Sequence, residues 1–201
     1  QKQEARYGVI RERIAETGLA VVYANLVGGQ DELIFDGGSF AMDQHGNLTA
    51  QCKYFEEALL MLEIQEDLRP DGQRAAALSE EASVYRALCL GVRDYIGKNR
   101  FPGVLLGLSG GIDSALTLAI AADALGANKV HAVMMPSDYT ASISIEDSRD
   151  MVQRLGVHYS EIAIKPIFDA FVAQLAGEFA GLAADTTEEN LQARTRGTLL
   201  M

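Results

Sequence analysis

Hydrophobic and polar residues follow one another along the chain in two different rhythms. Over residues 2–17, apolar side chains recur among charged ones at helical spacing and Gly18 follows, which predicts an amphipathic helix. Short apolar runs between turn residues come next. We predict a hairpin around Asp36-Gly37-Gly38, a turn at 45–47 and a loop at 26–31. The predicted strands are 19–25, 33–35, 39–42, 48–53 and 59–64.

From residue 80 onward, predicted helices and strands alternate. Such a β-α-β succession predicts an α/β fold with a parallel, doubly wound sheet, in which ligands bind beyond the carboxyl ends of the strands. Residues 66–80 are rich in turn residues and are predicted to be a linker in front of this sheet. The predicted helices are 80–98, 113–125, 144–155, one after Pro166 and one beginning at 185–187; the strands are 104–108, 130–135 and 157–164.

Composition and charge narrow the class of protein. The 201 residues are 48% hydrophobic and 22% charged, which is typical of a soluble protein with one core or one core and part of another. A formal charge of −11 disfavours nucleic acid and anionic membranes as partners. No apolar run is long enough for a membrane span and the first residues do not resemble a signal peptide, so we expect a cytoplasmic setting.

The most informative stretch lies between a predicted strand and a predicted helix. It reads Gly107-Leu108-Ser109-Gly110-Gly111-Ile112-Asp113-Ser114. Paired glycines allow a tight turn whose main-chain N–H groups reach a ligand, and a helix N-terminus favours an anion, so we predict a phosphate site. Asp113 would repel a phosphate unless a cation lay between them, which indicates a Mg²⁺-nucleotide. The alternative is that Asp113 only caps the helix and favours its dipole.

Other glycine motifs compete with this interpretation. The dinucleotide fingerprint needs a further glycine and the Walker loop needs a lysine, and this stretch has neither. The nucleophile elbow Gly-x-Ser-x-Gly does match, with Ser109 as the nucleophile of a hydrolase. His131 and His158 follow it, but each lies in an apolar, strand-like run, and the elbow does not explain Asp113-Ser114. The hydrolase is therefore the second hypothesis.

Two further places carry candidate contacts. Met135 ends a predicted strand at the same sheet edge as the glycine loop, where it would either pack against an adenine ring or fill the core. Asn190 and Arg194 lie one turn apart on the predicted last helix, so that both can face one side. Such a pair suits a carboxylate or phosphate ligand, and it equally suits a solvated helix face.

Three blocks of the sequence now support a resemblance. The run Ser109–Ser114 resembles the pyrophosphate-binding loop of N-type ATP pyrophosphatases, and 189–196 is similar to the NAD synthetase members of that group. The runs 25–32 and 35–40 resemble the closing part of the nitrilase-type glutaminase domain of the glutamine-dependent NAD synthetases. The resemblance implies the end of a nitrilase-like α/β sandwich at 1–65, a linker at 66–80, and an adenine nucleotide alpha hydrolase-like synthetase domain at 81–201.

The resemblance also implies a reaction and its contacts. Deamido-NAD would be activated by ATP as an adenylate and then amidated to NAD, with ammonia released from glutamine by the N-terminal domain. Asp113 would reach Mg²⁺, Asn190 and Arg194 would contact deamido-NAD, and Lys2 would contact glutamine unless it is a solvated terminal lysine. The implied ATP-binding residues are Gly107, Leu108, Ser109, Gly110, Gly111, Ile112, Asp113, Ser114 and Met135.

The sequence departs from the family pattern at both ends. The glutaminase Glu, Lys and Cys should all precede residue 1, and the remaining synthetase sheet should follow residue 201. We therefore expect an incomplete piece that is inactive by itself, and no glutaminase catalytic residue is assigned. For the complete enzyme the resemblance implies a homo-oligomer. Another amidotransferase of the ATP pyrophosphatase group and a non-enzymatic nucleotide-binding module remain alternatives.

Overall fold

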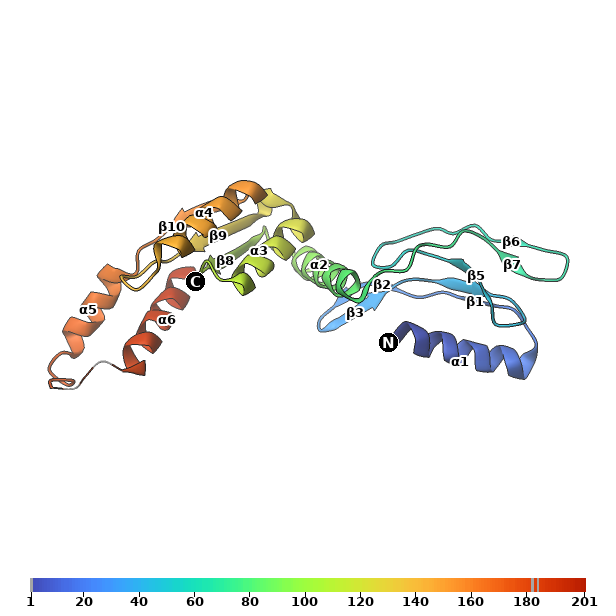
Figure 1. Cartoon of the computed structure of the whole chain (residues 1–201), viewed down its shortest axis with the longest axis horizontal. Coiled ribbons are helices and arrows are strands. Elements are labelled where there is room, and N and C mark those ends of the chain that lie inside the picture. The colour runs from blue at the N-terminus through green and yellow to red at the C-terminus, as the bar shows by residue number, and fades with distance from the viewer. Residues whose placement is uncertain (1, 182, 184) are drawn as a thin grey trace. The chain divides into compact units, whose positions relative to one another are not determined.

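The computed structural model of the chain describes residues 2–181, 183 and 185–201, with the side chain of Lys2 outside the described part. Two compact units make up the chain, Gln1–Tyr95 and Ile96–Met201, and each is described here by itself (Figure 1). The predicted domain limits at 65 and 80 remain a prediction.

The first unit contains the predicted N-terminal helix packed on an antiparallel sheet. Tyr7 and Ile14 of the helix are buried against Phe40 and Met42 of the central strand. The rings of Tyr7 and Phe40 meet edge to face, with centroids 4.8 Å apart. The apolar stripe of the helix thus predicted its buried face. The elements are α1 (Lys2–Thr17), β1 (Val21–Tyr23), β4 (Phe40–Met42) and β5 (Leu48–Gln51), with strand order β1-β4-β5.

The loop predicted at 26–31 is wrong, because β2 (Val27–Gln30) forms an antiparallel hairpin with β3 (Leu33–Asp36). Gly29 serves helix packing rather than a turn. A Cβ on Gly29 would lie 3.2 Å from the Cα of Gly91, which belongs to α2 (Glu80–Lys98). The Gly29 N–H also donates to the Asp94 carboxylate at 2.8 Å. The close approach of α2 therefore explains the glycine in this strand.

The hairpin predicted around Asp36-Gly37-Gly38 is also wrong. β3 pairs with β2, whereas β4 pairs with β1 and β5. Gly37 and Gly38 both have left-handed backbones, with φ of +65° and +63°, and carry the chain from one sheet to the other. The turn predicted at 45–47 is confirmed, since the Gly46 N–H donates to the Asp43 carbonyl between β4 and β5.

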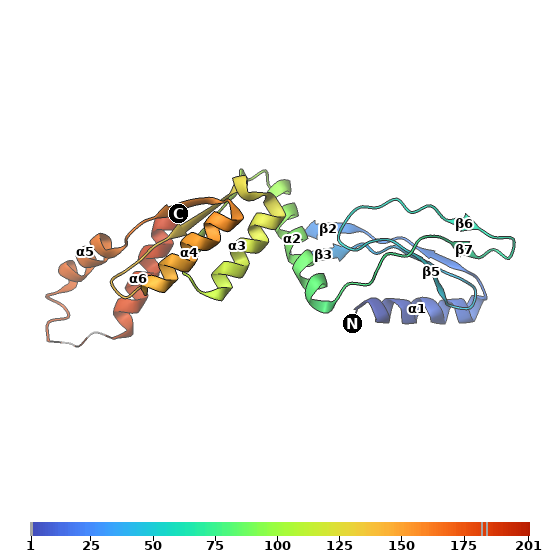
Figure 2. The same ribbon diagram turned by 45° about the horizontal axis from the view of Figure 1, so that its top comes forward.

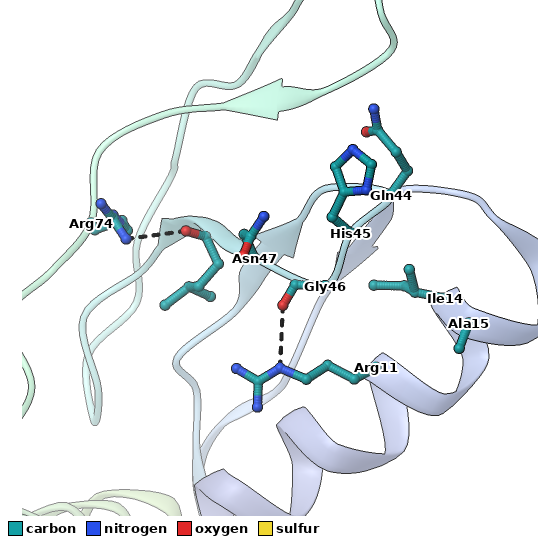
Figure 3. Close-up of a pocket in the computed structure, with 9 residues that line it drawn as sticks. Arg11, Ile14, Ala15, Gln44, His45, Gly46, Asn47 and Arg74 are labelled. Atoms are coloured by element: carbon teal, nitrogen blue, oxygen red, sulfur yellow. Dashed lines mark hydrogen bonds between the residues drawn. The ribbon is translucent and has the colours of Figure 1, made fainter.

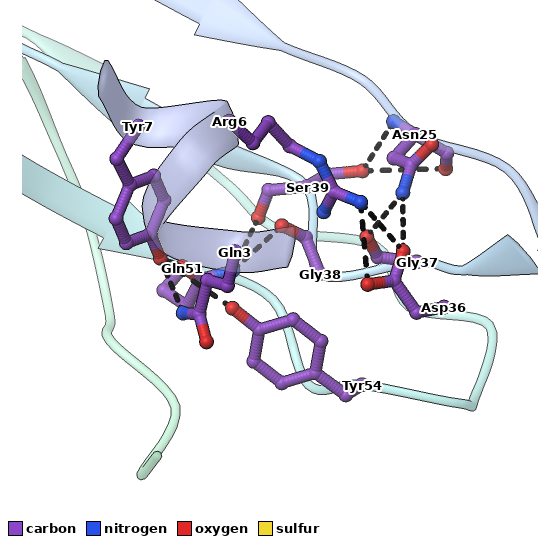
Figure 4. A network of polar contacts seen from close by, with 10 residues as sticks. All are labelled: Gln3, Arg6, Tyr7, Asn25, Asp36, Gly37, Gly38, Ser39, Gln51 and Tyr54. Atoms are coloured by element: carbon purple, nitrogen blue, oxygen red, sulfur yellow. Dashed lines mark hydrogen bonds and ion pairs between the residues drawn. The ribbon is translucent and has the colours of Figure 1, made fainter. Parts of the chain in front are cut away.

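Polar side chains hold the turn at Gly37 and Gly38, the glycine turn, from outside (Figure 4). Arg6 donates from one Nη2 to both carboxylate oxygens of Asp36, at 3.0 and 3.2 Å. The Asn25 amide donates to Asp36 at 2.8 Å and to the Gly37 carbonyl at 2.8 Å. This ion pair therefore ties α1 to the turn that joins the two sheets.

Residues 59–80 differ from their predicted structure. The predicted strand 59–64 is reduced to β6 (Glu63–Ile64), which pairs with β7 (Pro70–Asp71). Leu59 and Met61 are exposed and pair with no strand in the described residues. An apolar run without a pairing partner does not form a strand. The run predicted as a linker does have structure, because Gln51 of β5 exchanges main-chain hydrogen bonds with Gln73 and Ala75.

The second unit is the predicted α/β sheet with helices on both faces. Its strands are parallel in the order β8-β9-β10, which confirms the doubly wound fold. Helices α3 and α4 lie side by side on one face (Figure 2). On the other face, Val133, Met135 and Ile164 pack against the end of α6. The elements are β8 (Val104–Leu108), α3 (Ile112–Leu125), β9 (Val130–Met134), α4 (Ser142–Leu155), β10 (His158–Glu161), α5 (Lys165–Leu175) and α6 (Thr186–Leu200).

Candidate functional site

The glycine loop lies at the carboxyl edge of the parallel sheet. β8 ends at Leu108, which pairs with Met134, the last residue of β9. The chain then turns, and α3 begins at Ile112 with Gly111 as its N-cap. No side chain caps this helix at Gly111, and Asp113 lies one position inside its first turn. Asp113 is therefore not the cap, and the first N–H groups of α3 face a site where parallel sheets bind ligands.

Two serine hydroxyls link the ends of the loop. The Ser109 N–H donates to the Ser114 hydroxyl at 3.2 Å, and the two hydroxyl oxygens lie 3.0 Å apart. Ser114 donates to the Gly111 carbonyl at 2.9 Å, and the Gly111 N–H donates to the Ser109 hydroxyl at 3.3 Å. The side chain of Ser109 is exposed. The loop is thus held in shape by groups that can themselves donate to a bound anion.

Gly110 lets a second helix reach the loop. Its φ is +80°, and a Cβ at this position would lie 2.6 Å from the Cα of Ser144 in the first turn of α4. The N-terminal turns of α3 and α4 therefore both lie at the loop. Because helix N-termini carry a partial positive charge, this arrangement favours an anionic ligand.

Asp113 is exposed in the first turn of α3, beside Ile112. Among the residues that the structure describes, no group of three or more His, Cys, Asp or Glu side chains is placed to hold a metal ion. Mg²⁺ is commonly bound by one or two protein carboxylates together with substrate phosphates. The donor set thus fits a Mg²⁺ ion carried by a nucleotide, with Asp113 as the protein ligand, better than a cage made by the protein alone.

A cavity of about 510 Å³ adjoins the loop. Met135 borders it and also belongs to the core, being 6% exposed and packed with Val133 and Ile164. Both interpretations of Met135 are therefore compatible with its position. The cavity is lined by Gly107, Leu108, Ser109, Met134, Met135, Thr140, Ala193, Arg196, Gly197 and Leu200.

Arg196 is the charged lining residue that sequence reasoning missed. Its Nε donates to the Met135 carbonyl at 3.1 Å, and its Nη2 lies 3.5 Å from the Ser137 hydroxyl. A signal existed, because Arg196 ends the same family-like block that supplied Asn190 and Arg194. Spacing along one helix did not reveal which arginine lies against the end of β9.

Asn190 and Arg194 lie on α6 as predicted, and both are exposed. An Arg194 Nη1 donates to the Asn190 carbonyl at 3.4 Å, one turn back along the helix. The helix begins at Thr186 with Asp185 as its N-cap in a capping box, and hydrogen bonds from Thr187 hold the pKa of the Asp185 carboxyl below its usual value. The deamido-NAD contacts of Asn190 and Arg194 remain a prediction, and the predicted glutamine contact of Lys2 lies outside the described residues.

Neither histidine that follows Ser109 in the described residues can serve as the base of the hydrolase alternative. His131 pairs with Leu105 in the sheet, four residues before Ser109. At about 3.3 Å per strand residue, this places it about 13 Å from Ser109. Its Nε2 lies 2.9 Å from the Ser160 hydroxyl, and His158 begins β10 at the same amino end of the sheet. Neither histidine can therefore take a proton from Ser109.

The first unit has a shallow polar hollow of about 480 Å³ at the turn between β4 and β5 (Figure 3). Arg11 donates to the Gly46 carbonyl at 3.2 Å and Arg74 to the Leu48 carbonyl at 3.1 Å. Burial raises the pKa of Asp43 in this turn, but hydrogen bonds from Asn47 and His45 outweigh it and hold the pKa below its usual value. These contacts stabilise the turn.

Beneath the glycine turn, the first unit buries a cluster of hydroxyl and amide groups (Figure 4). Tyr7 donates to the Gln51 side chain, accepts from the Gln3 amide at 2.7 Å, and lies 3.4 Å from the Tyr54 hydroxyl. The Gln51 amide donates in turn to the Gly38 carbonyl at 2.7 Å. Burial and the contact with Tyr7 raise the pKa of Tyr54, so this hydroxyl stays protonated. The cluster fixes the turn from inside, as Arg6 does from outside.

Among the described residues, no helix is both long enough and apolar enough to cross a bilayer.

Comparison with known families divides the chain in the same order as its two units. The sequence model of the NAD synthase family matches residues 84–201, and that of the carbon-nitrogen hydrolase family matches residues 3–73. A glutamine-dependent NAD(+) synthetase of Acinetobacter baylyi is 48% identical over 202 residues, covering 100% of this chain and 37% of the relative. That of Thermotoga maritima is 41% identical over 217 residues, covering 91% of this chain and 38% of the relative.

Solved structures agree with this pattern. The glutamine-dependent NAD+ synthetase from Acinetobacter baumannii, in complex with adenosine diphosphate, matches with a TM-score of 0.94 and 48% identity, covering 100% of this chain and 38% of that one. The NMN synthetase from Francisella tularensis matches with a TM-score of 0.54 and 27% identity, covering 62% of this chain and 49% of that one. The chain thus spans well under half the length of the glutamine-dependent relatives that it matches.

Proposed function

The chain belongs to the NAD synthase family, and from this premise we propose that the complete protein carrying it converts deamido-NAD to NAD in an ATP-dependent amidation. The observation that carries the proposal is the loop Ser109–Ser114, which meets the N-terminal turns of two helices at the carboxyl edge of the sheet. Such a loop suits a nucleotide phosphate. A 48% identical structure in complex with adenosine diphosphate supports the nucleotide.

In this proposal, the loop holds the phosphates of ATP. Main-chain N–H groups and the hydroxyls of Ser109 and Ser114 donate to phosphate oxygens, and Met135 borders the space for the base. Mg²⁺, held by Asp113 together with the nucleotide, would neutralise part of the phosphate charge. The protein's own contribution is to orient the α-phosphate and to keep the loop rigid.

The chemistry that follows needs positioning more than a protein nucleophile. The nicotinate carboxylate of deamido-NAD attacks the α-phosphorus of ATP, which forms an adenylate and releases pyrophosphate. Ammonia then attacks the activated carbonyl carbon, which gives the amide and releases AMP. Asn190 and Arg194, one turn apart on α6, are proposed to hold deamido-NAD. Both steps depend on bringing charged groups together in a fixed geometry.

Glutamine is the proposed source of ammonia. The carbon-nitrogen hydrolase match at residues 3–73 and the glutamine-dependent relatives support this part of the proposal. Lys2 is the proposed glutamine contact, and no residue of this chain is assigned to the hydrolysis itself. We infer that α1 and the glycine turn contribute structure to the glutaminase domain through the Arg6–Asp36 ion pair.

The test uses the complete protein with Mg-ATP, deamido-NAD and either glutamine or ammonium. We expect NAD and pyrophosphate in equal amounts. The variant Ser114→Ala should raise the KM for ATP about 10- to 100-fold, since a hydrogen bond to a charged phosphate is worth about 1.5–3 kcal/mol. Thr117→Ala is the matched control, because its hydroxyl donates to the Asp113 carbonyl within the same helix. Nicotinate mononucleotide should be included as an acceptor, given the similarity to an NMN synthetase.

Two results would overturn this proposal. The first is a complete protein that forms no NAD and releases no pyrophosphate with either nitrogen source. The second is faster amidation of nicotinate mononucleotide than of deamido-NAD, which would assign the site to a different acceptor.

A further inference from the structure

The proposed nucleotide site needs a cation that its loop does not contain. Residues 107–114 include no Lys or Arg and add the negative charge of Asp113, in a chain whose formal charge is −11. The triphosphate of ATP is strongly anionic, and main-chain donors neutralise only part of that charge. A positively charged side chain from elsewhere in the fold would therefore change the affinity of the site.

One such side chain is in place. Among the described residues that line the cavity beside Gly107 and Ser109, Arg196 is the only one with a charge. It is half-buried, whereas Arg194 on the same helix is exposed. Residues two apart on a helix point in directions about 160° apart, so these two arginines serve different sides of α6.

The guanidinium of Arg196 is held by the end of the sheet. Its Nε donates to the carbonyl of Met135, one residue beyond the last paired residue of β9, at 3.1 Å. Its Nη2 reaches the Ser137 hydroxyl only at 3.5 Å. An arginine has several more N–H donors than these contacts use. A planar cation anchored through one nitrogen at the cavity wall keeps the others for an anion.

We propose that Arg196 contacts the phosphate groups of ATP and thereby acts as the protein's cation in the adenylation step, an inference that rests on the proposed function. The leaving pyrophosphate gains negative charge as the α-phosphorus bond to it breaks, and a fixed guanidinium beside it stabilises that charge. Arg194, on the other side of the helix, is left to the acceptor substrate. The two arginines of one block would then serve the two substrates separately.

The experiment varies ATP and deamido-NAD separately in the complete protein carrying Arg196→Gln, Arg196→Lys or Arg194→Gln. Arg196→Gln should raise the KM for ATP about 10- to 100-fold, since a hydrogen bond to a charged group is worth about 1.5–3 kcal/mol. The KM for deamido-NAD should change much less. The KM for ATP of Arg196→Lys should lie between those of the wild type and of Arg196→Gln, because lysine keeps the positive charge but loses the planar guanidinium. Arg194→Gln should raise the KM for deamido-NAD and change the KM for ATP much less.

Further measurements separate this role from a structural one. Ser137→Ala removes the long Nη2 contact and keeps the Nε anchor, so the KM for ATP should rise less than about 3-fold. Calorimetric binding of Mg-ATP and a melting curve without nucleotide are recorded for every variant. A wild type that binds Mg-ATP beside an Arg196→Gln variant that binds it equally well would overturn the inference alone. A wild type that neither binds Mg-ATP nor releases pyrophosphate would overturn the proposed function with it.

Discussion

Replacing Gly110 by alanine tests the geometry of the loop directly. The residue has φ of +80°, and a Cβ there would lie 2.6 Å from both the Cα and the Cβ of Ser144. Ser144 lies in the first turn of α4, so the colliding atoms include main chain and cannot rotate away. Alanine at this position therefore has to strain its own backbone and also push α4 away from the loop.

The expected cost has two parts. A left-handed backbone costs a residue with a Cβ about 1–2 kcal/mol. Forcing an extra carbon into a packed contact adds about 1–3 kcal/mol. Gly110→Ala should therefore lower the local stability of the second unit by about 2–5 kcal/mol, and Mg-ATP binding should be lost because the loop and α4 no longer meet.

Gly156→Ala is the matched control. Gly156 ends α4 with φ of +67°, and a Cβ there would meet nothing within 4 Å. It should cost only the backbone part, about 1–2 kcal/mol. Hydrogen exchange of the amides in β8, α3 and α4 measures both costs in the complete protein, and calorimetry measures the binding of Mg-ATP. Equal protection and equal binding in the two variants would refute the proposed contact between the loop and α4.

Three other predictions concern stability. Arg6→Ala should lower the free energy of unfolding of the first unit by about 1–3 kcal/mol in urea, because Asp36 loses a half-buried partner; an unchanged midpoint would contradict this. Asp43→Asn should destabilise the protein near neutral pH, and the difference from wild type should shrink below about pH 4, because the folded pKa of Asp43 lies below its usual 3.8 and its contribution is lost as pH falls through that folded value; a difference that stays constant from about pH 7 to pH 3 would contradict it. Asp185→Ala should speed hydrogen exchange in the first turn of α6, which loses its cap; unchanged exchange there would argue against the capping box.

The sequence predicted the second unit better than the first because the signals in the second are local. Buried parallel strands and amphipathic helices each show their period within a single segment, so β8, α3 and β9 could be placed without knowing their neighbours. In the first unit, the role of Gly29 depends on Gly91 of α2, which approaches it from more than sixty residues later in the chain. A glycine pair alone cannot distinguish a turn from such a close packing contact.

The site shows the same division. The loop could be located because strand, glycine turn and helix start are consecutive in the chain. Arg196 could not be assigned, because its contact with the Met135 carbonyl joins α6 to the end of β9 and leaves no local pattern. The capping alternative for Asp113 failed for a related reason. The position at which α3 starts decides which residue is the cap, and the helix starts at Ile112, so the cap is Gly111, two residues before Asp113.

The paired hydroxyls of Ser109 and Ser114 affect how a nucleotide would enter. Before a nucleotide binds, the two hydroxyl oxygens already lie within hydrogen-bond distance of one another, at 3.0 Å. An arriving phosphate oxygen then replaces one acceptor with a more strongly charged one, and the main chain need not rearrange around it. The ordering of the loop is completed during folding, so the entropic cost of arranging these groups does not reduce the affinity at the moment of binding.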